Sequence, residues 1–319
     1  MNKSYVVGID IGGQTAKIGI VDASGNVLSQ IAIRSDNTTS NEEFIAHLCD
    51  AVNGLITKNY TLDHIQGIGI GAPNGNYYKG TIENAVNLTW GGTQVIPFAE
   101  LMSKKMGLPV RLTNDANAAA VGEMTYGAAQ GLKNFIMITL GTGVGSGIVI
   151  DGEVLYGHDG FAGELGHVTM VRKNGRLCGC GKSGCLEAYA SATGVARTAR
   201  ELLETTNTES LLRTMPAETI TSKDVFEAAE KGDELAKEIF DYTGKMLGEA
   251  FADFVAFSSP EAIILFGGLT KSGDLIMKPI TDNLNKNVMP LWKNKIKVLF
   301  SRLKESDAAI LGASALAWK

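Results

Sequence analysis

Residues 5–22 read YVVGIDIGGQTAKIGIVD, two short apolar strands joined by a glycine-containing turn at residues 12–15. β-Branched residues are frequent in both strands, as is typical of β-structure. A second turn at residues 23–26 leads into a further strand over residues 27–34. The sequence therefore predicts three consecutive strands joined by tight turns.

Residues 134–151, NFIMITLGTGVGSGIVID, repeat this arrangement: a strand, a glycine turn at residues 141–145, a strand, and an Asp-Gly hairpin turn. At one constant offset three positions of the two segments match: Gly12 with Gly141, Ile20 with Val149 and Asp22 with Asp151. We interpret the match as a duplicated α/β unit.

Helical patterns and further strands alternate with these units. Ser40 and Glu43 form a capping box that opens a helix with Phe44 and Leu48 on its apolar face. Further strands are predicted at 65–71, 110–113, 262–266 and 297–300, and further helices near 97–106, 116–126, 190–204, 223–231, 234–257 and 307–318. The alternation favours the α/β class, and 319 residues at roughly 150 per domain predict about two domains.

Composition narrows the function classes. The 29 basic and 34 acidic side chains give a net charge of −5, so no general positive field favours nucleic acid or an anionic membrane. The N-terminal apolar run is too short for a signal peptide, and no stretch reaches about 18 uninterrupted apolar residues. We expect a cytoplasmic enzyme with no nucleic-acid or membrane partner.

Two glycine turns are candidate phosphate-binding loops. Glycine lets backbone N–H groups approach a phosphate without a Cβ in the way. The residues concerned are Gly12, Gly13 and Thr15 in the first turn, and Gly141, Thr142 and Gly143 in the second. The alternative interpretation is a plain tight hairpin. The P-loop motif is absent, and a Rossmann site is disfavoured because the chain continues as strand after Gly143. Asp10, beside the first turn, is a candidate Mg²⁺ ligand.

A cysteine–histidine cluster is the most specific pattern in the chain. His167, Cys178, Cys180 and Cys185 lie within nineteen residues and are separated by several glycines. These side chains suit tetrahedral Zn²⁺ in a closed structural site. The alternative is a set of buried or free cysteines beside an unrelated histidine. Cys49 stands apart, on the apolar face of a predicted helix, where a small core residue is expected.

Four polar side chains near these features are candidates for substrate chemistry. Asn114 and Asp115 end a predicted strand, where open α/β sheets gather ligands. Asp115 could accept a proton from an acceptor hydroxyl, or could simply cap the helix that follows. Glu164 and Glu187 flank the metal loop and are either hydroxyl acceptors for a sugar or solvated charges.

Together these motifs resemble the ROK family (repressors, open reading frames, kinases) of the sugar-kinase/Hsp70/actin superfamily, and most resemble its bacterial glucokinases. The motifs that carry the resemblance are Asp10–Thr15, Asn114-Asp115, Gly141–Gly147, Glu164–His167, Cys178–Glu187 and Gly267-Gly268. The resemblance implies two ribonuclease-H-like α/β domains of the actin type, with ATP and sugar bound in the cleft between them. We expect the boundaries 1–113, completed by the C-terminal helix 307–319, and 114–306.

The resemblance also implies roles for single residues. Asp115 resembles the catalytic base. Residues that resemble sugar ligands are Gly75, Asn76, Asn87, Asn114, Asp115, Glu164, His167 and Glu187, with His167 also on zinc. Residues that resemble the nucleotide site are Asp10, Gly12, Gly13, Thr15, Gly141, Thr142 and Gly143 at the phosphates, and Gly267 and Gly268 at the adenosine. The implied cofactors are ATP, Mg²⁺ and a structural Zn²⁺.

Several alternatives remain. Asn74 stands where the family usually has glycine, and Gln14 stands where threonine is common. Because of Asn74, the sequence does not decide which sugar is the substrate. D-Glucose is the expected substrate, followed by N-acetylmannosamine, N-acetylglucosamine and allose. A sugar-sensing repressor of the family would carry an added helix-turn-helix domain ahead of the first strand, for which the sequence leaves no room. A zinc hydrolase would need an open metal position. The resemblance suggests a homodimer.

Overall fold

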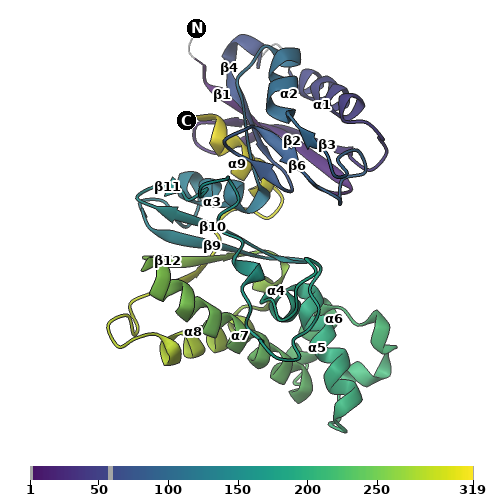
Figure 1. Ribbon diagram of the computed structural model, residues 1–319, viewed down its shortest axis with the longest axis vertical. Helices are drawn as coiled ribbons and strands as arrows, with labels where there is room; N and C mark the ends of the chain where they lie inside the picture. Colours follow the sequence, from purple (N-terminus) through teal and green to yellow (C-terminus); the bar gives the residue numbers. More distant parts are fainter. Residues whose placement is uncertain (1–2, 57–59, 319) are drawn as a thin grey trace. The chain divides into compact units, whose positions relative to one another are not determined.

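The computed structural model describes residues 3–56 and 60–318 (Figure 1). Contacts between Cα atoms divide the chain into two compact units. The first comprises residues 1–133, 147–163 and 301–319, and the second comprises residues 134–146 and 164–300. This division differs from the boundary expected after residue 113, because it assigns residues 114–133 and 147–163 to the first unit.

The first unit is built on a five-stranded sheet with the order β3-β2-β1-β4-β8. Its strands are β1 (Tyr5–Ile11), β2 (Thr15–Asp22), β3 (Val27–Arg34), β4 (Ile65–Gly71) and β8 (Val110–Thr113). The first three strands are antiparallel neighbours, whereas β4 runs parallel to both β1 and β8. All five strands lie where the sequence predicts them. The parallel register brings the end of β1 beside the end of β4, since Asp10 pairs with Gly71.

In the described part of the first unit there are four α-helices: α1 (Asn41–Leu55), α2 (Phe98–Met106), α3 (Asp115–Tyr126) and α9 (Ala308–Ala315). The Ser40 side chain caps α1 by accepting the N–H of Glu43 at 3.2 Å, which is one half of the predicted capping box. Helix α9 lies directly on the strands, because a Cβ on Gly69 would meet the Ala313 carbonyl oxygen at 1.9 Å. A 3₁₀ turn (Leu316–Trp318) ends the predicted C-terminal helix, and residue 319 lies outside the described residues.

A small three-stranded sheet also belongs to the first unit and is not foreseen by the sequence patterns. It consists of β5 (Gly75–Asn76), β6 (Thr81–Glu83) and β7 (Val95–Ile96). Its strands are two or three residues long, too short for an alternating pattern to stand out. Its first strand, β5, consists of the candidate sugar ligands Gly75 and Asn76.

The second sheet has the order β11-β10-β9-β12-β13. Its strands are β9 (Phe135–Leu140), β10 (Val144–Ile150), β11 (Glu153–Val154), β12 (Ala262–Phe266) and β13 (Lys297–Phe300). Strand β12 is parallel to both β9 and β13. Between β10 and β11 the predicted hairpin turn is confirmed, since Asp151 and Gly152 both have positive φ (52° and 80°).

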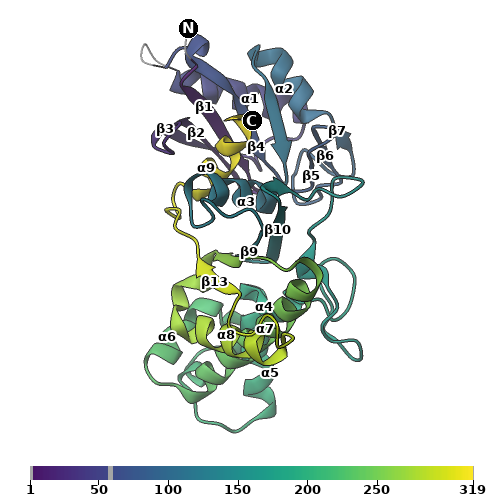
Figure 2. The ribbon, with the colours of Figure 1, turned by 90° about the vertical axis from the view of Figure 1, so that its left-hand side faces the viewer.

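Five helices belong to the second unit: α4 (Glu187–Ala190), α5 (Ala192–Thr205), α6 (Ser222–Glu230), α7 (Glu234–Ser258) and α8 (Asp274–Asn287). Helices α7 and α8 lie side by side in both views (Figures 1 and 2). A Cβ on Gly244 would meet Pro279 Cγ at 2.5 Å, so the two helices pack at backbone distance. Among the described residues, no helix is both long enough and apolar enough to span a membrane.

Candidate functional site

The first glycine turn follows β1 and is held in place by two hydrogen bonds. The Gly12 N–H donates to the Thr15 carbonyl at 2.9 Å, and Ser35 donates its hydroxyl to the Gly12 carbonyl at 2.7 Å. The N–H groups of Gly13 and Gln14 have no partner within the described chain. A fixed turn with two unused N–H donors is what an anion site requires.

Two carboxylates lie where β1 and β8 end. Asp10 precedes the first turn, and Asp115 is the first residue of α3, so the alternative that Asp115 caps this helix is wrong. The cap is Asn114, whose side-chain oxygen accepts the Asn117 N–H at 2.7 Å. Gly71 separates the two acids, since a Cβ there would lie 3.7 Å from Asp115 Cα and 3.9 Å from Asp10 Oδ1.

The environment raises the pKa of both acids. Desolvation, followed by the charge of Asp115, raises the pKa of Asp10 to about 6 against the opposing effect of Lys17. Desolvation also raises the pKa of Asp115, against the Ala116 N–H that donates to Oδ1 at 2.8 Å. The Asp115 side chain remains accessible to solvent, so its raised pKa reflects crowding by surrounding protein rather than full enclosure. Such a group is accessible to a substrate and better suited than an ordinary aspartate to accept a proton near neutral pH.

The loop at residues 74–76 packs against the end of β8, next to these acids. A Cβ on Gly75 would lie 2.4 Å from the Thr113 carbonyl oxygen, so only glycine allows this approach. Asn76 is fully buried and donates to the Asp159 carbonyl at 2.7 Å. Asn87 contacts the first turn, because a Cβ on Gly13 would lie 3.1 Å from its carbonyl oxygen. Three expected sugar ligands, Gly75, Asn87 and Asn114, thus lie close to β-strand ends or the first turn.

The second glycine turn joins β9 to β10. The Gly141 N–H closes it on the Gly143 carbonyl at 3.1 Å, and the Val144 N–H donates to Glu187 Oε2 at 2.9 Å. The N–H groups of Thr142 and Gly143 have no partner in residues 3–56 and 60–318. This turn therefore offers the same pair of unused donors as the first.

The cysteine–histidine cluster is brought together as predicted. One ligand atom from each of His167, Cys178, Cys180 and Cys185 lies within 4.8 Å of the others. The sulfurs of Cys180 and Cys185 are 3.7 Å apart, and His167 Nδ1 is 3.7 Å from the Cys178 sulfur. Two Zn–S bonds of about 2.3 Å at a tetrahedral angle place sulfurs about 3.8 Å apart. The donor set and its spacing therefore fit a tetrahedral zinc ion.

The other nitrogen of His167 lies near an acidic side chain. Its Nε2 lies 3.9 Å from a carboxylate oxygen of Glu164, whose side chain is exposed. Glu187 also reaches the cluster, since its Oε1 is 3.4 Å from the Cys178 sulfur. Three of the expected sugar ligands, Glu164, His167 and Glu187, thus lie in or beside the cysteine–histidine cluster of the second unit.

A cavity of about 440 Å³ adjoins Gly268 in the second unit. Its lining comprises Ser222, Lys223, Phe226, Glu227, Phe240, Gly268, Leu269, Lys271 and Ser272. Gly267 has φ 111°, and a Cβ on it would meet the Leu140 carbonyl oxygen at 2.5 Å. The lining residues from α6 and α7 were missed by sequence reasoning, because their only signal is the general amphipathic pattern of a helix.

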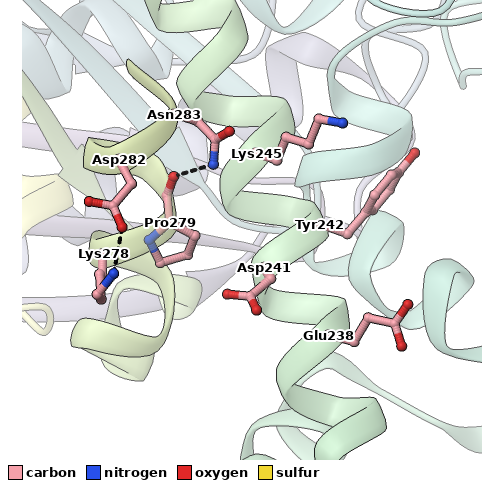
Figure 3. A pocket seen from close by; sticks show the side chains of 8 residues that line it. All are labelled: Glu238, Asp241, Tyr242, Lys245, Lys278, Pro279, Asp282 and Asn283. Carbon is pink, nitrogen blue, oxygen red and sulfur yellow. Dashed lines mark hydrogen bonds and ion pairs between the residues drawn. The ribbon is translucent and has the colours of Figure 1, made fainter. Parts of the chain in front are cut away.

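A hollow of about 410 Å³ between α7 and α8 contains none of the sequence-predicted residues (Figure 3). Its charged lining is partly paired internally, since Lys278 contacts Asp282 at 2.5 Å. Asn283 donates to the Pro279 carbonyl of its own helix at 2.8 Å. This hollow lies outside the candidate site.

Known proteins resemble the chain over nearly its whole length. A glucokinase from Halalkalibacterium halodurans is 36% identical over 98% of this chain and 94% of that protein. A xylose repressor from Caldicellulosiruptor bescii is 29% identical over 98% of this chain and 77% of the repressor. A crystal structure of a ROK family glucokinase from Streptomyces griseus, in complex with glucose and AMPPNP, is 34% identical. It superposes with a TM-score of 0.79, covering 98% of this chain and 99% of that one.

The expected fold is confirmed by this superposition, because the two mixed sheets match a ROK sugar kinase of the actin-like ATPase fold. The ROK family profile matches residues 6–319. The chain therefore belongs to the ROK family.

Proposed function

We propose that this chain is an ATP-dependent sugar kinase that transfers the terminal phosphate of ATP to D-glucose, giving glucose 6-phosphate. The observation that carries the proposal is the pair of glycine turns, each with two unused N–H donors, in a chain that also carries Asp115, an accessible acid with a raised pKa. Phosphoryl transfer relies on positioning and charge stabilisation by such donors. The similarity to glucokinases supports this activity.

Asp115 is the proposed general base. Its carboxylate takes the proton from the attacking sugar hydroxyl, and its N-cap neighbour Asn114 orients that hydroxyl. The other proposed sugar ligands are Gly75, Asn76 and Asn87 in the first unit, and Glu164, His167 and Glu187 in the second. Asn76 is the least accessible of them, so its role includes holding the loop against Asp159.

The nucleotide residues divide between the two turns. Gly12, Gly13 and Thr15, with Gly141, Thr142 and Gly143, are proposed to surround the phosphates, and Asp10 to hold Mg²⁺ through water. Gly267 and Gly268 are proposed to contact the adenosine, with the adjoining cavity accepting the base. Bound Mg²⁺–ATP supplies the phosphoryl group and neutralises part of its charge.

The cysteine–histidine cluster is proposed to hold a structural Zn²⁺. Three thiolates and one imidazole complete a tetrahedron, so no position remains for a hydrolytic water. A bound ion would fix His167 and Cys185, and Glu187 follows Cys185 by two residues in the sequence. On the family resemblance we also propose a cytoplasmic homodimer, with domains 1–113 plus 307–319 and 114–306.

A second candidate substrate class is favoured by Asn74. This residue adopts φ 52° and donates to the Asn84 carbonyl at 3.1 Å, so the loop beside Gly75 has a fixed side chain where the family usually has glycine. Another hexose or an N-acetylhexosamine is therefore the alternative phosphate acceptor. A kinase for such a sugar ranks ahead of a sugar-sensing repressor as the alternative function.

A coupled ADP-release assay over a panel of hexoses tests the proposal. We expect turnover with glucose, dependent on Mg²⁺, and slower turnover with N-acetylmannosamine, N-acetylglucosamine and allose. Faster turnover with one of the latter would correct the substrate only. Absence of ADP release with every sugar, in protein that contains its zinc, would reject the kinase.

A further inference from the structure

The junction between α4 and α5 holds the second glycine turn on one side. The Ala192 N–H donates to the Gly141 carbonyl at 2.9 Å, and the Thr193 hydroxyl donates to the Thr142 carbonyl at 2.9 Å. These bonds add to the one between Val144 and Glu187. The junction therefore contacts consecutive peptide groups of the turn.

The two clamped carbonyls belong to the same peptide groups as the two unused donors. In a trans peptide the C=O and the N–H point in opposite directions. Because Ala192 holds the Gly141 carbonyl, the Thr142 N–H points away from the junction. Because Thr193 holds the Thr142 carbonyl, the Gly143 N–H points away from it as well.

The junction is itself anchored to the metal loop by a buried guanidinium. Arg176 donates to the carbonyls of Ala188 at 3.1 Å and Gly194 at 3.4 Å, on either side of Thr193 in the sequence. Its charge is balanced by Glu201, to which Nε donates at 3.1 Å, and its Cζ lies 4.5 Å from the centre of the Tyr189 ring. A buried, paired arginine with these bonds is a fixed support for the junction.

We propose that Thr193 is a positioning residue for the nucleotide: its hydroxyl orients the peptide between residues 142 and 143 so that the Gly143 N–H binds a phosphate that ATP shares with ADP. This inference rests on the proposed kinase function and deepens it, because it assigns a side chain that none of the sequence motifs contains. Thr193 itself touches neither the nucleotide nor the sugar in this account. Its effect reaches the phosphate only through the backbone of the turn.

The substitution Thr193→Val tests the assignment, since it keeps the branched shape and removes the donor. The Thr193 hydroxyl also lies 2.8 Å from the Ser191 hydroxyl, but the side chain is exposed, so the variant is expected to fold with a melting temperature close to that of the unmodified protein. We expect the affinity for ADP, measured by calorimetry, to fall roughly three- to tenfold, the effect of one lost hydrogen bond. Affinity for adenosine, which has no phosphate, should not change. The KM for ATP should rise while the KM for the sugar stays the same.

Two further variants make the test specific. Thr193→Ser keeps a hydroxyl and should restore most of the ADP affinity. Thr205→Val removes a similar donor at the other end of α5, where the hydroxyl donates to the Glu201 carbonyl at 2.7 Å, and should leave ADP binding unchanged.

Three results would overturn the assignment: ADP affinity unchanged in Thr193→Val, an equal loss for ADP and adenosine, or no recovery in Thr193→Ser. The outcome for the kinase itself is separate. If the unmodified protein bound ADP no more tightly than adenosine, the proposed phosphate site would fail, whatever Thr193 does.

Discussion

The two glycine turns have the same local plan but different supports. In both, a strand enters a turn closed by a glycine N–H, at Gly12 and Gly141, and the two following N–H groups have no partner among the residues that the structure describes. The first turn is held by Ser35, which follows β3 in the same sheet. The second is held by Glu187 and Thr193, which follow the metal loop.

The residue two positions before each turn glycine also differs. Asp10 stands in the first unit where Thr139 stands in the second. Asp10 is a largely buried carboxyl near Asp115, whereas Thr139 accepts the N–H of Gly145 at 3.1 Å. The first copy of the motif thus has an ionisable carboxyl, and the second has a neutral hydroxyl that accepts a backbone N–H of the turn. The difference indicates that each turn can be perturbed separately.

Metal removal should have the largest effect, and of the two glycine turns it should affect only the second. Structural zinc contributes about 10 kcal/mol or more to the folding of small zinc domains. Without it, residues 168–186 should lose hydrogen-exchange protection and activity should vanish. The amides of residues 140–145 should then exchange faster, while those of residues 10–15 stay unchanged.

Readdition of zinc to the stripped protein is the control and should restore both protection and activity. Equal loss of protection at the two turns would show that the metal loop supports the whole chain rather than the second turn.

Replacing Asp10 should produce a pH-dependent effect confined to the first unit. Its pKa is raised from 3.8 to about 6, so between these values the folded chain binds the proton more tightly than the unfolded chain. The contribution of Asp10 to the free energy of unfolding therefore falls as pH rises through this window, by about 3 kcal/mol in total. Asp10→Asn should remove that contribution and be more stable than the unmodified protein at pH 7. Urea unfolding at pH 4 and pH 7 measures the difference.

Thr139→Val, at the matching position of the second turn, is the control for that measurement and should keep the pH-dependent contribution of Asp10. If Asp10→Asn kept the same dependence on pH, the charge asymmetry between the turns would be wrong. Activity of Asp10→Asn should also require more Mg²⁺.

The sequence predicts most of the fold because its strands are long, apolar and bounded by glycine turns. Helix α8 was missed, since Pro279 lies inside it and lacks the N–H that a helix interior uses. Tertiary packing explains the tolerance, because the proline ring lies against Gly244 of α7. The pairing of Gly244 with Pro279 cannot be read from either segment alone.

The parts of the candidate site that the sequence predicts are those whose glycines, cysteines and carboxylates lie close together along the chain. The proposed zinc ligands lie close in sequence, and the structure brings them together. Phe226 of the cavity beside Gly268, and Thr193 beside Thr142, contact the site from distant segments. A threonine in a helical pattern has no signal of its own until the fold shows which carbonyl it meets.

The role of Asp115 is tested most directly by Asp115→Asn, which keeps the size of the side chain and removes its ability to accept a proton. The account predicts that kcat for glucose phosphorylation falls at least about 1,000-fold, within the range of general-base catalysis. Zinc content and the calorimetric affinities for glucose and ADP should be retained. Turnover within a few-fold of the unmodified protein would contradict the proposed mechanism.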